Sequence, residues 1–169
     1  HNGIIENSDQ LKKDLESKGL KFKSQTDTEV ITLLITEELK NESPIDSVFN
    51  TLKRLKGSFA LGIIFKNWKN IIIGARRGSP LAVGFAKDEN YLGSDSYALK
   101  SMTNKISYLD DGDLCVLTKD KVEFYDENKN KINKKTHTLS DDKNVADKGE
   151  YQNFMSKENE DWKLKNEKF

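Results

Sequence analysis

Hydrophobic residues recur at helical spacing along the first part of the chain. Leu11 and Leu15 lie four residues apart and follow Asn7 and Ser8, two residue types that are favoured at helix N-termini. Gly19 suits the position just after a helix, because glycine adopts the left-handed conformation found there. The pattern therefore predicts a first helix between residues 8 and 18.

Two more helices are expected before residue 57. Residues 20–22 alternate apolar side chains with lysine and predict a short strand. Thr26 and Glu29 then have the spacing of a capping box, and the apolar residues 30–39 cover more than one helical stripe, which indicates a well-buried helix. A proline in the first turn and apolar residues at 3.6-residue spacing predict a third helix over residues 44–56.

From residue 59 the pattern changes to strands. Residues 59–65 and 71–75 are apolar on both faces and are separated by a polar turn, so they predict a hairpin in a sheet that is covered on both sides. Shorter apolar runs predict further strands at residues 81–85, 91–93, 106–109, 114–117 and 122–125, with a short helix at 95–99. Three helices followed by paired strands indicate an α+β sandwich, with sheet packed on sheet and helices outside.

The last forty residues are rich in Lys, Asn and Asp. Residues 159–169 have no coherent apolar face, and we expect them to be a disordered tail. The side chains that could dock the preceding segment are few: Ile132, Leu139, Val145, Tyr151, Phe154 and Met155.

Composition narrows the functional classes. The 169 residues contain 28 Lys and Arg against 28 Asp and Glu, so no basic surplus favours nucleic acid or an anionic membrane. No apolar run approaches the roughly 18 residues that span a bilayer. A single cysteine excludes an internal disulfide and indicates a reducing, cytoplasmic compartment. Since the chain begins with His1 and without a signal peptide, we expect it to be processed or to be part of a longer protein.

Asn2 and Gly3 are the first candidates for chemistry. The Asn2 side chain offers an amide donor, and Gly3 offers a backbone N–H that no Cβ obstructs. Two adjacent donors of this kind can hold the oxyanion that develops in acyl transfer. The same Asn-Gly pair is also a common turn, and the residue types alone leave both interpretations open.

Asp27 is the second candidate, at the first position of a predicted helix. A carboxylate there stabilises the helix N-terminus through the macrodipole. It can equally point outward and bind a substrate ammonium group, so both roles stay open.

Other reactive residue types favour structural roles. Cys115 lies within an apolar strand, a setting that keeps a thiol buried and inert. His137 lies in a polar segment and is expected at the surface. With two histidines and one cysteine there is no metal-site pattern, and no glycine-rich phosphate loop is present, so no cofactor is predicted. Residues 76–81 contain two arginines that could hold an anion, but Gly78 and Pro80 favour a tight loop.

Six stretches of the chain, taken in order, resemble the glutaminase domain of glutamine–fructose-6-phosphate aminotransferases. They are residues 1–7, 24–31, 75–81, 94–99, 111–113 and 147–151. The resemblance covers residues 1–158, which we take as a partial type 2 glutamine amidotransferase domain, and leaves 159–169 as a divergent tail. Amidophosphoribosyltransferases share the His-Asn-Gly step, whereas residues 26–31 and 76–81 point to the hexosamine enzyme.

The resemblance implies a fold and a set of roles. The fold is a partial four-layer α/β/β/α sandwich of the N-terminal-nucleophile hydrolase type. Asn2 and Gly3 would form the oxyanion hole, and Asp27 would bind the α-ammonium of L-glutamine. The family's nucleophile is an N-terminal cysteine whose own amino group is the base. In the complete enzyme, a homo-oligomer, ammonia passes to a sugar-isomerase domain that makes glucosamine 6-phosphate.

The chain also departs from this family. The segment with the nucleophilic cysteine and the arginine that binds the glutamine carboxylate would precede His1, and Cys115 does not match it. We therefore expect the polypeptide to lack glutaminase activity on its own. Two alternatives are a non-catalytic module that complements a separate N-terminal piece, or remains as a relic, and a glutaminase that delivers ammonia to another acceptor, such as a purine precursor.

Overall fold

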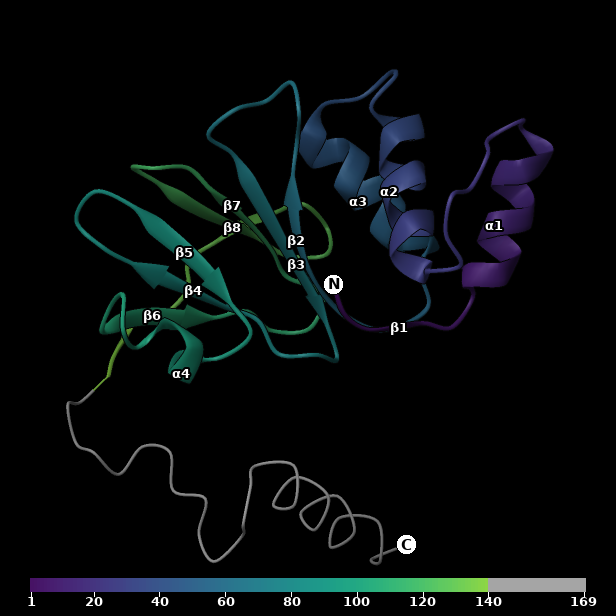
Figure 1. Cartoon of the computed structure of the whole chain (residues 1–169). Coiled ribbons are helices and arrows are strands. Elements are labelled where there is room, and N and C mark those ends of the chain that lie inside the picture. The colour runs from purple at the N-terminus through teal and green to yellow at the C-terminus, as the bar shows by residue number, and fades with distance from the viewer. Residues whose placement is uncertain (140–169) are drawn as a thin grey trace, which may run out of the picture. The chain divides into compact units, whose positions relative to one another are not determined.

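The computed structural model describes residues 1–139, which form ten strands and four helices (Figure 1). The helices are α1 (Ser8–Ser17), α2 (Asp27–Glu38), α3 (Pro44–Arg54) and α4 (Ser96–Leu99). The strands are β1 (Asn2–Ile5), β2 (Gly57–Ile64), β3 (Ile72–Arg77), β4 (Ala82–Phe85), β5 (Asn90–Gly93), β6 (Lys105–Tyr108), β7 (Leu114–Leu117), β8 (Val122–Tyr125), β9 (Lys131–Ile132) and β10 (His137–Thr138).

The strands form two antiparallel sheets. One has the order β1-β2-β3-β7-β8-β9, and the other has the order β10-β6-β4-β5. Helices α1, α2 and α3 lie on the side of the first sheet that faces away from the second, and α4 lies beyond the second sheet (Figure 1). The predicted α+β sandwich is confirmed, with an outer layer on the second sheet that consists of the four-residue helix α4.

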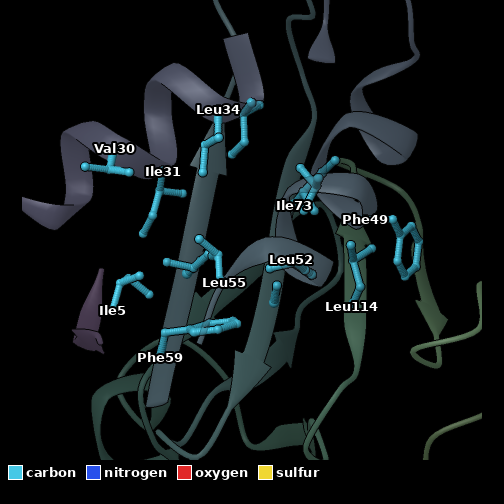
Figure 2. Close-up of a cluster of buried hydrophobic side chains, with 14 of the residues drawn as sticks. Ile5, Val30, Ile31, Leu34, Phe49, Leu52, Leu55, Phe59, Ile73 and Leu114 are labelled. Carbon is cyan, nitrogen blue, oxygen red and sulfur yellow. The ribbon is translucent and has the colours of Figure 1, made fainter. Parts of the chain in front are cut away.

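The larger core lies between the helices and the first sheet. Figure 2 shows Ile31 and Leu34 of α2 directed toward the strands that carry Phe59, Ile73 and Leu114. A second core lies between the two sheets, where Cys115 and Leu117 pack with side chains of β4 and its flanking loops. Successive residues of β7 enter opposite cores, which explains why the strands predicted to be covered on both faces are apolar at nearly every position.

The strand predicted for residues 20–22 is wrong, because the segment is irregular. Leu20 and Phe22 still pack against the larger core, but the adjacent backbone finds a side-chain acceptor instead of a neighbouring strand. The N–H groups of Lys23 and Ser24 donate to the Glu29 carboxylate at 2.8 and 2.6 Å.

Glu29 also changes the predicted capping box. Thr26 does cap α2, since its hydroxyl oxygen accepts the N–H of Glu29 at 3.4 Å. The Glu29 carboxylate, however, accepts from the hydroxyl and N–H of Ser24 and the N–H of Lys23. These hydrogen bonds hold the pKa of the Glu29 carboxyl below its usual value, and the bond from the Ser24 hydroxyl has the largest effect.

Four sequence predictions lie outside the described residues. They are the family resemblance at residues 147–151, the domain boundary at 158, the disordered tail over 159–169 and the docking side chains Val145, Tyr151, Phe154 and Met155. Within residues 1–139, no helix has the length and apolar character needed to cross a bilayer.

Candidate active site

Strand β1 forms the edge of the first sheet and carries two of the candidate residues. Its register pairs Asn2 with Ala60 and Ile5 with Gly57. The N–H of Glu6 donates to the Lys56 carbonyl at 3.0 Å, so the backbone groups of even-numbered residues face β2. The N–H of Ile5 donates instead to Oδ2 of Asp27 at 2.9 Å, on the opposite side. Because the direction of the backbone N–H groups alternates along a strand, the Gly3 N–H points the same way as the Ile5 N–H. It therefore faces away from β2, toward the edge of the sheet that no other described strand occupies.

Position 3 requires glycine. Its φ of +105° lies in a region that L-residues rarely adopt. A Cβ at this position would also lie 2.1 Å from the carbonyl oxygen of Ser58 on β2, which is far inside van der Waals contact. The Asn-Gly pair therefore belongs to a strand in close contact with its neighbour, and the turn interpretation is wrong.

Asn2 is exposed, and within residues 1–139 the structure assigns its side-chain amide no hydrogen-bond partner. Its donors are therefore available to a ligand at the edge of the sheet.

Asn7 fixes the other end of β1. The sequence predicts it as a side-chain cap of α1, but it occupies the N-cap position without such a bond. Its side-chain amide donates to the Arg54 carbonyl at 2.8 Å, and its amide oxygen accepts the Lys56 N–H at 2.9 Å. Asn7 thus attaches the end of β1 to the connection between α3 and β2, and so helps to set the register that places Gly3.

Asp27 is the first residue of α2, as predicted, and its carboxylate reaches β1. Oδ2 accepts the Ile5 N–H, and Oδ1 lies 3.6 Å from Nδ1 of His1. The side chain remains 25% exposed. One carboxylate therefore connects the beginning of the helix to the edge strand and keeps part of its surface open to solvent.

His1 completes this group, although no sequence pattern predicted a role for it. As a whole residue it is exposed, but its side chain is only 5% exposed, because the backbone accounts for the accessible surface. Nδ1 lies 3.0 Å from the Thr28 hydroxyl oxygen. Asp27 and Thr28 are adjacent on α2, so one ring nitrogen approaches both side chains.

The two arginines at the end of β3 donate hydrogen bonds to backbone carbonyl groups of the protein. Arg77 donates from Nη1 to the Leu55 carbonyl at 2.7 Å and from Nη2 to the Leu52 carbonyl at 3.3 Å, at the end of α3. Arg76 donates to the Leu109 carbonyl, and its Nε lies 3.3 Å from the Asp111 carboxylate. The predicted loop is therefore shorter than residues 76–81: it spans residues 78–81 between β3 and β4, and both arginines belong to β3.

This loop also supports the edge strand. Gly78 has a φ of +76°, and a Cβ there would lie 2.2 Å from Oγ of Ser58. Ser58 is the residue whose carbonyl oxygen contacts Gly3 on the other side. Two separate sequence motifs therefore meet at one residue of β2.

An ion-pair cluster secures the 111–113 signature. Lys134 lies 2.6 Å from the Asp110 carboxylate and also contacts that of Asp113, which is buried. Burial opposes the charge on Lys134, but its bonds to these two carboxylates outweigh that effect and raise its pKa. The contacts of Asp113 thus give residues 111–113 a structural role.

Cys115 is fully buried between the two sheets, as predicted. Burial raises the pKa of its thiol to about 12, so the nucleophilic thiolate is not populated at neutral pH. His137 is exposed on β10, also as predicted, and its ring lies 6.0 Å from that of Tyr108. Among the described residues, no three His, Cys, Asp or Glu side chains are arranged to hold a metal ion.

An apolar cavity of about 580 Å³ lies beside the candidate site. Its walls are one face of α2 and residues 61–68, and His1 and Thr28 stand at its edge. The cavity is not lined by Asn2, Gly3 or Asp27. The polar candidate site and the apolar cavity are therefore separate, and His1 contributes to both.

Residues 1–101 match the family described as the glutamine amidotransferase domain. The chain is also 45% identical over 159 residues to proteins named glutamine–fructose-6-phosphate aminotransferase (isomerizing) from Brucella abortus and Zymomonas mobilis. The aligned part is 94% of this chain and 26% of each relative, so the chain spans about a quarter of their length.

Two solved structures resemble the fold. One is the glutamine phosphoribosylpyrophosphate amidotransferase from B. subtilis complexed with ADP and GMP, with a TM-score of 0.65, 27% identity and coverage of 77% of this chain and 29% of that one. The other is described as the allosteric regulatory enzyme of purine biosynthesis, with a TM-score of 0.62, 27% identity and coverage of 76% and 28%.

Proposed function

Since this chain belongs to the glutamine amidotransferase domain family, we propose that it forms the oxyanion-binding and ammonium-binding side of a glutaminase site. In the proposed reaction, L-glutamine is hydrolysed to glutamate, and the ammonia is transferred within a larger protein to make glucosamine 6-phosphate. Asn2 and Gly3 would stabilise the oxyanion, and Asp27 would bind the α-ammonium group.

One observation carries this proposal: the Asp27 carboxylate accepts the N–H of Ile5, two residues along β1 from Gly3. A strand advances by ~3.3 Å per residue, so the Gly3 N–H and the Asp27 carboxylate are separated along the edge by about 7 Å. This spacing suits a ligand with a cation at one end and a carbonyl at the other. Extended L-glutamine is such a ligand.

The donors suit an acyl-transfer transition state. Attack on the glutamine amide turns its carbonyl oxygen into an oxyanion, and fixed N–H donors that stabilise this charge lower the barrier. The Gly3 N–H faces away from β2, and the exposed side-chain amide of Asn2 belongs to the preceding residue. No Cβ at Gly3 obstructs a ligand that approaches its N–H.

The proposed nucleophile is a cysteine outside these 169 residues. Cys115 is the sole cysteine of the chain, and its burial and raised pKa remove it from consideration. The thiolate would form a thioester with the glutamyl group and release ammonia, and water would then hydrolyse the thioester.

The proposed ammonia acceptor is a sugar phosphate. The relatives at 45% identity are named for fructose 6-phosphate, whereas the phosphoribosylpyrophosphate enzyme of the similar structure is 27% identical. The proposed partners are accordingly a sugar-isomerase domain and the cysteine-bearing segment.

The test compares L-glutamine with glutaramate, which lacks the α-ammonium group. Calorimetric or NMR titration should show that the protein binds L-glutamine about tenfold more tightly, because a charge-assisted hydrogen bond contributes roughly 1.5 kcal/mol. Asp27→Asn should remove this preference.

The matched control is Asp9→Asn, which changes an exposed aspartate in the first turn of α1. It should keep the wild-type preference. Equal affinity of the unmodified protein for the two ligands, or an unchanged preference in Asp27→Asn, would refute the proposed role of Asp27.

A further inference from the structure

We propose that His1 is a positioning residue that fixes the orientation of the Asp27 carboxylate, together with Thr28. This inference rests on the proposed function for the meaning of Asp27 as an ammonium site. The contacts among the three side chains can be tested without any ligand.

The His1 ring lies beside both the Asp27 carboxylate and the Thr28 hydroxyl. Nδ1 lies 3.6 Å from Asp27 Oδ1 and 3.0 Å from the Thr28 hydroxyl oxygen. The ring is 5% exposed, so it is held within the protein. The opposite carboxylate oxygen, Oδ2, accepts the Ile5 N–H at 2.9 Å.

The Asp27 carboxylate is thus confined from two sides. The last torsion of an aspartate side chain is broad and roughly two-fold, so a single hydrogen bond leaves the carboxylate free to rock. The imidazole beside Oδ1 limits that motion, and the Thr28 hydroxyl limits the motion of the imidazole. An ammonium ligand then meets an oriented acceptor and loses less freedom on binding.

A purely structural role for His1 makes different predictions. If the ring only filled space, an apolar side chain of similar size could replace it, and any loss of stability would affect the whole fold. A positioning role is local. It depends on a polar nitrogen at the place of Nδ1, and its loss changes the exchange rate of the Ile5 amide and the preference for ligands with an α-ammonium group.

The experiment uses three variants. His1→Leu removes the ring nitrogen, His1→Asn restores an amide nitrogen near the place of Nδ1, and Thr28→Val removes the hydroxyl that contacts the ring. Thr32→Val is the control, because Thr32 lies one turn further along α2 and its hydroxyl donates to the helix backbone at 3.0 Å. All proteins carry the same short N-terminal tag, so that residue 1 is not the terminal residue in any of them.

The first readout is hydrogen exchange at the Ile5 amide, with the Leu34 amide as a measure of global stability. We expect exchange at Ile5 to become about fivefold faster in His1→Leu and Thr28→Val, the scale of one weakened hydrogen bond, and to stay near the wild-type rate in His1→Asn and Thr32→Val. Exchange at Leu34 should not change. An unchanged Ile5 amide in His1→Leu, or a His1→Asn protein that behaves like His1→Leu, overturns the proposal.

The second readout is the affinity ratio between L-glutamine and glutaramate. His1→Leu should lower this ratio severalfold, and His1→Asn should restore it. If the unmodified protein shows no preference for L-glutamine, the proposed function fails, while the exchange rates at Ile5 still decide whether His1 orients Asp27.

Discussion

At position 3 the absence of a side chain determines where β1 can run. The Gly3 backbone has a φ of +105° and approaches the Ser58 carbonyl more closely than any Cβ allows. The sequence indicated that Asn2 and Gly3 are polar donors, but it could not separate a turn from a strand edge. The register with β2, a contact with residues more than fifty positions away, resolves that choice.

Replacement of Gly3 by alanine tests this close approach. We expect Gly3→Ala to lower the free energy of unfolding by about 1–3 kcal/mol, because it adds both a disfavoured φ and a contact with Ser58. The control is Gly19→Ala, where φ is +85° but no atom lies within 4 Å of the added Cβ. Urea denaturation of the two variants should show the larger loss for Gly3→Ala. Equal losses would mean that β1 moves away from β2 at little cost.

The Cys115 thiol gives a second prediction at the residue scale. It is fully buried with a pKa of about 12, so it should not react with a thiol reagent at pH 8 in the native protein and should react at once in denaturant. For the same reason, the purified 169-residue polypeptide should not hydrolyse L-glutamine. Glutamine hydrolysis that a cysteine reagent abolishes would contradict this prediction.

At the scale of elements, helix positions follow from the sequence better than the segments between them. Helices α2 and α3 begin where Thr26 and Pro44 predict, because the start of a helix depends on residues within one turn. Asn7 and Glu29 differ, since their side chains satisfy backbone groups outside their own helices. The backbone partners of these side chains lie in or next to irregular segments, and hydrophobic periodicity does not predict such contacts.

Glu29 makes the start of α2 sensitive to acid. Its pKa is lower in the folded state than the ordinary value of 4.5, so its contribution to stability is complete above that value and is lost as the pH falls through the lower folded pKa. We expect Glu29→Gln to reduce the melting temperature at pH 6, and the difference from wild type to shrink as the pH is lowered below 4.5.

The control for Glu29 is Glu16→Gln, an exposed position on α1 whose carboxylate has no hydrogen bond within residues 1–139. Its melting temperature should follow that of the wild type at every pH. A constant difference between Glu29→Gln and wild type from pH 6 to acid would show that the carboxylate charge has no part in the effect.

At the scale of the molecule, the strands of the first sheet join two cores. In β7, Leu114 and Val116 pack against the helices, while Cys115 and Leu117 pack against the second sheet. The apolar character of both faces made this arrangement predictable, and the sandwich was recognised on that ground. The hairpin of β2 and β3 was predicted from the polar turn between them. The pairing of β1 with β2 and of β3 with β7 in the order β1-β2-β3-β7-β8-β9 was not predicted, because a period of two fixes the faces of a strand and leaves its more distant neighbours undetermined.

Shared strands predict that the two cores unfold together. Leu34→Ala in the helix–sheet core and Leu117→Ala in the sheet–sheet core should each cost about 2–5 kcal/mol, because both side chains are almost fully buried. Each variant should shift the unfolding transitions followed by far-UV and near-UV circular dichroism by the same amount. Ile64→Ala, at a position that is 80% exposed, should change stability little. Separate transitions for the two cores would contradict this account.

The most direct test of the glutamine site follows the assigned NMR signals of the protein during a titration with L-glutamine. A glutamine site at Asn2, Gly3 and Asp27 predicts that the signals of the Gly3 amide, the Asn2 side-chain amide and the Ile5 amide shift together with one dissociation constant, and that Asp27→Asn suppresses all three responses. Shifts confined to the apolar cavity around residues 61–68, with Gly3 and Asn2 unaffected, would contradict it.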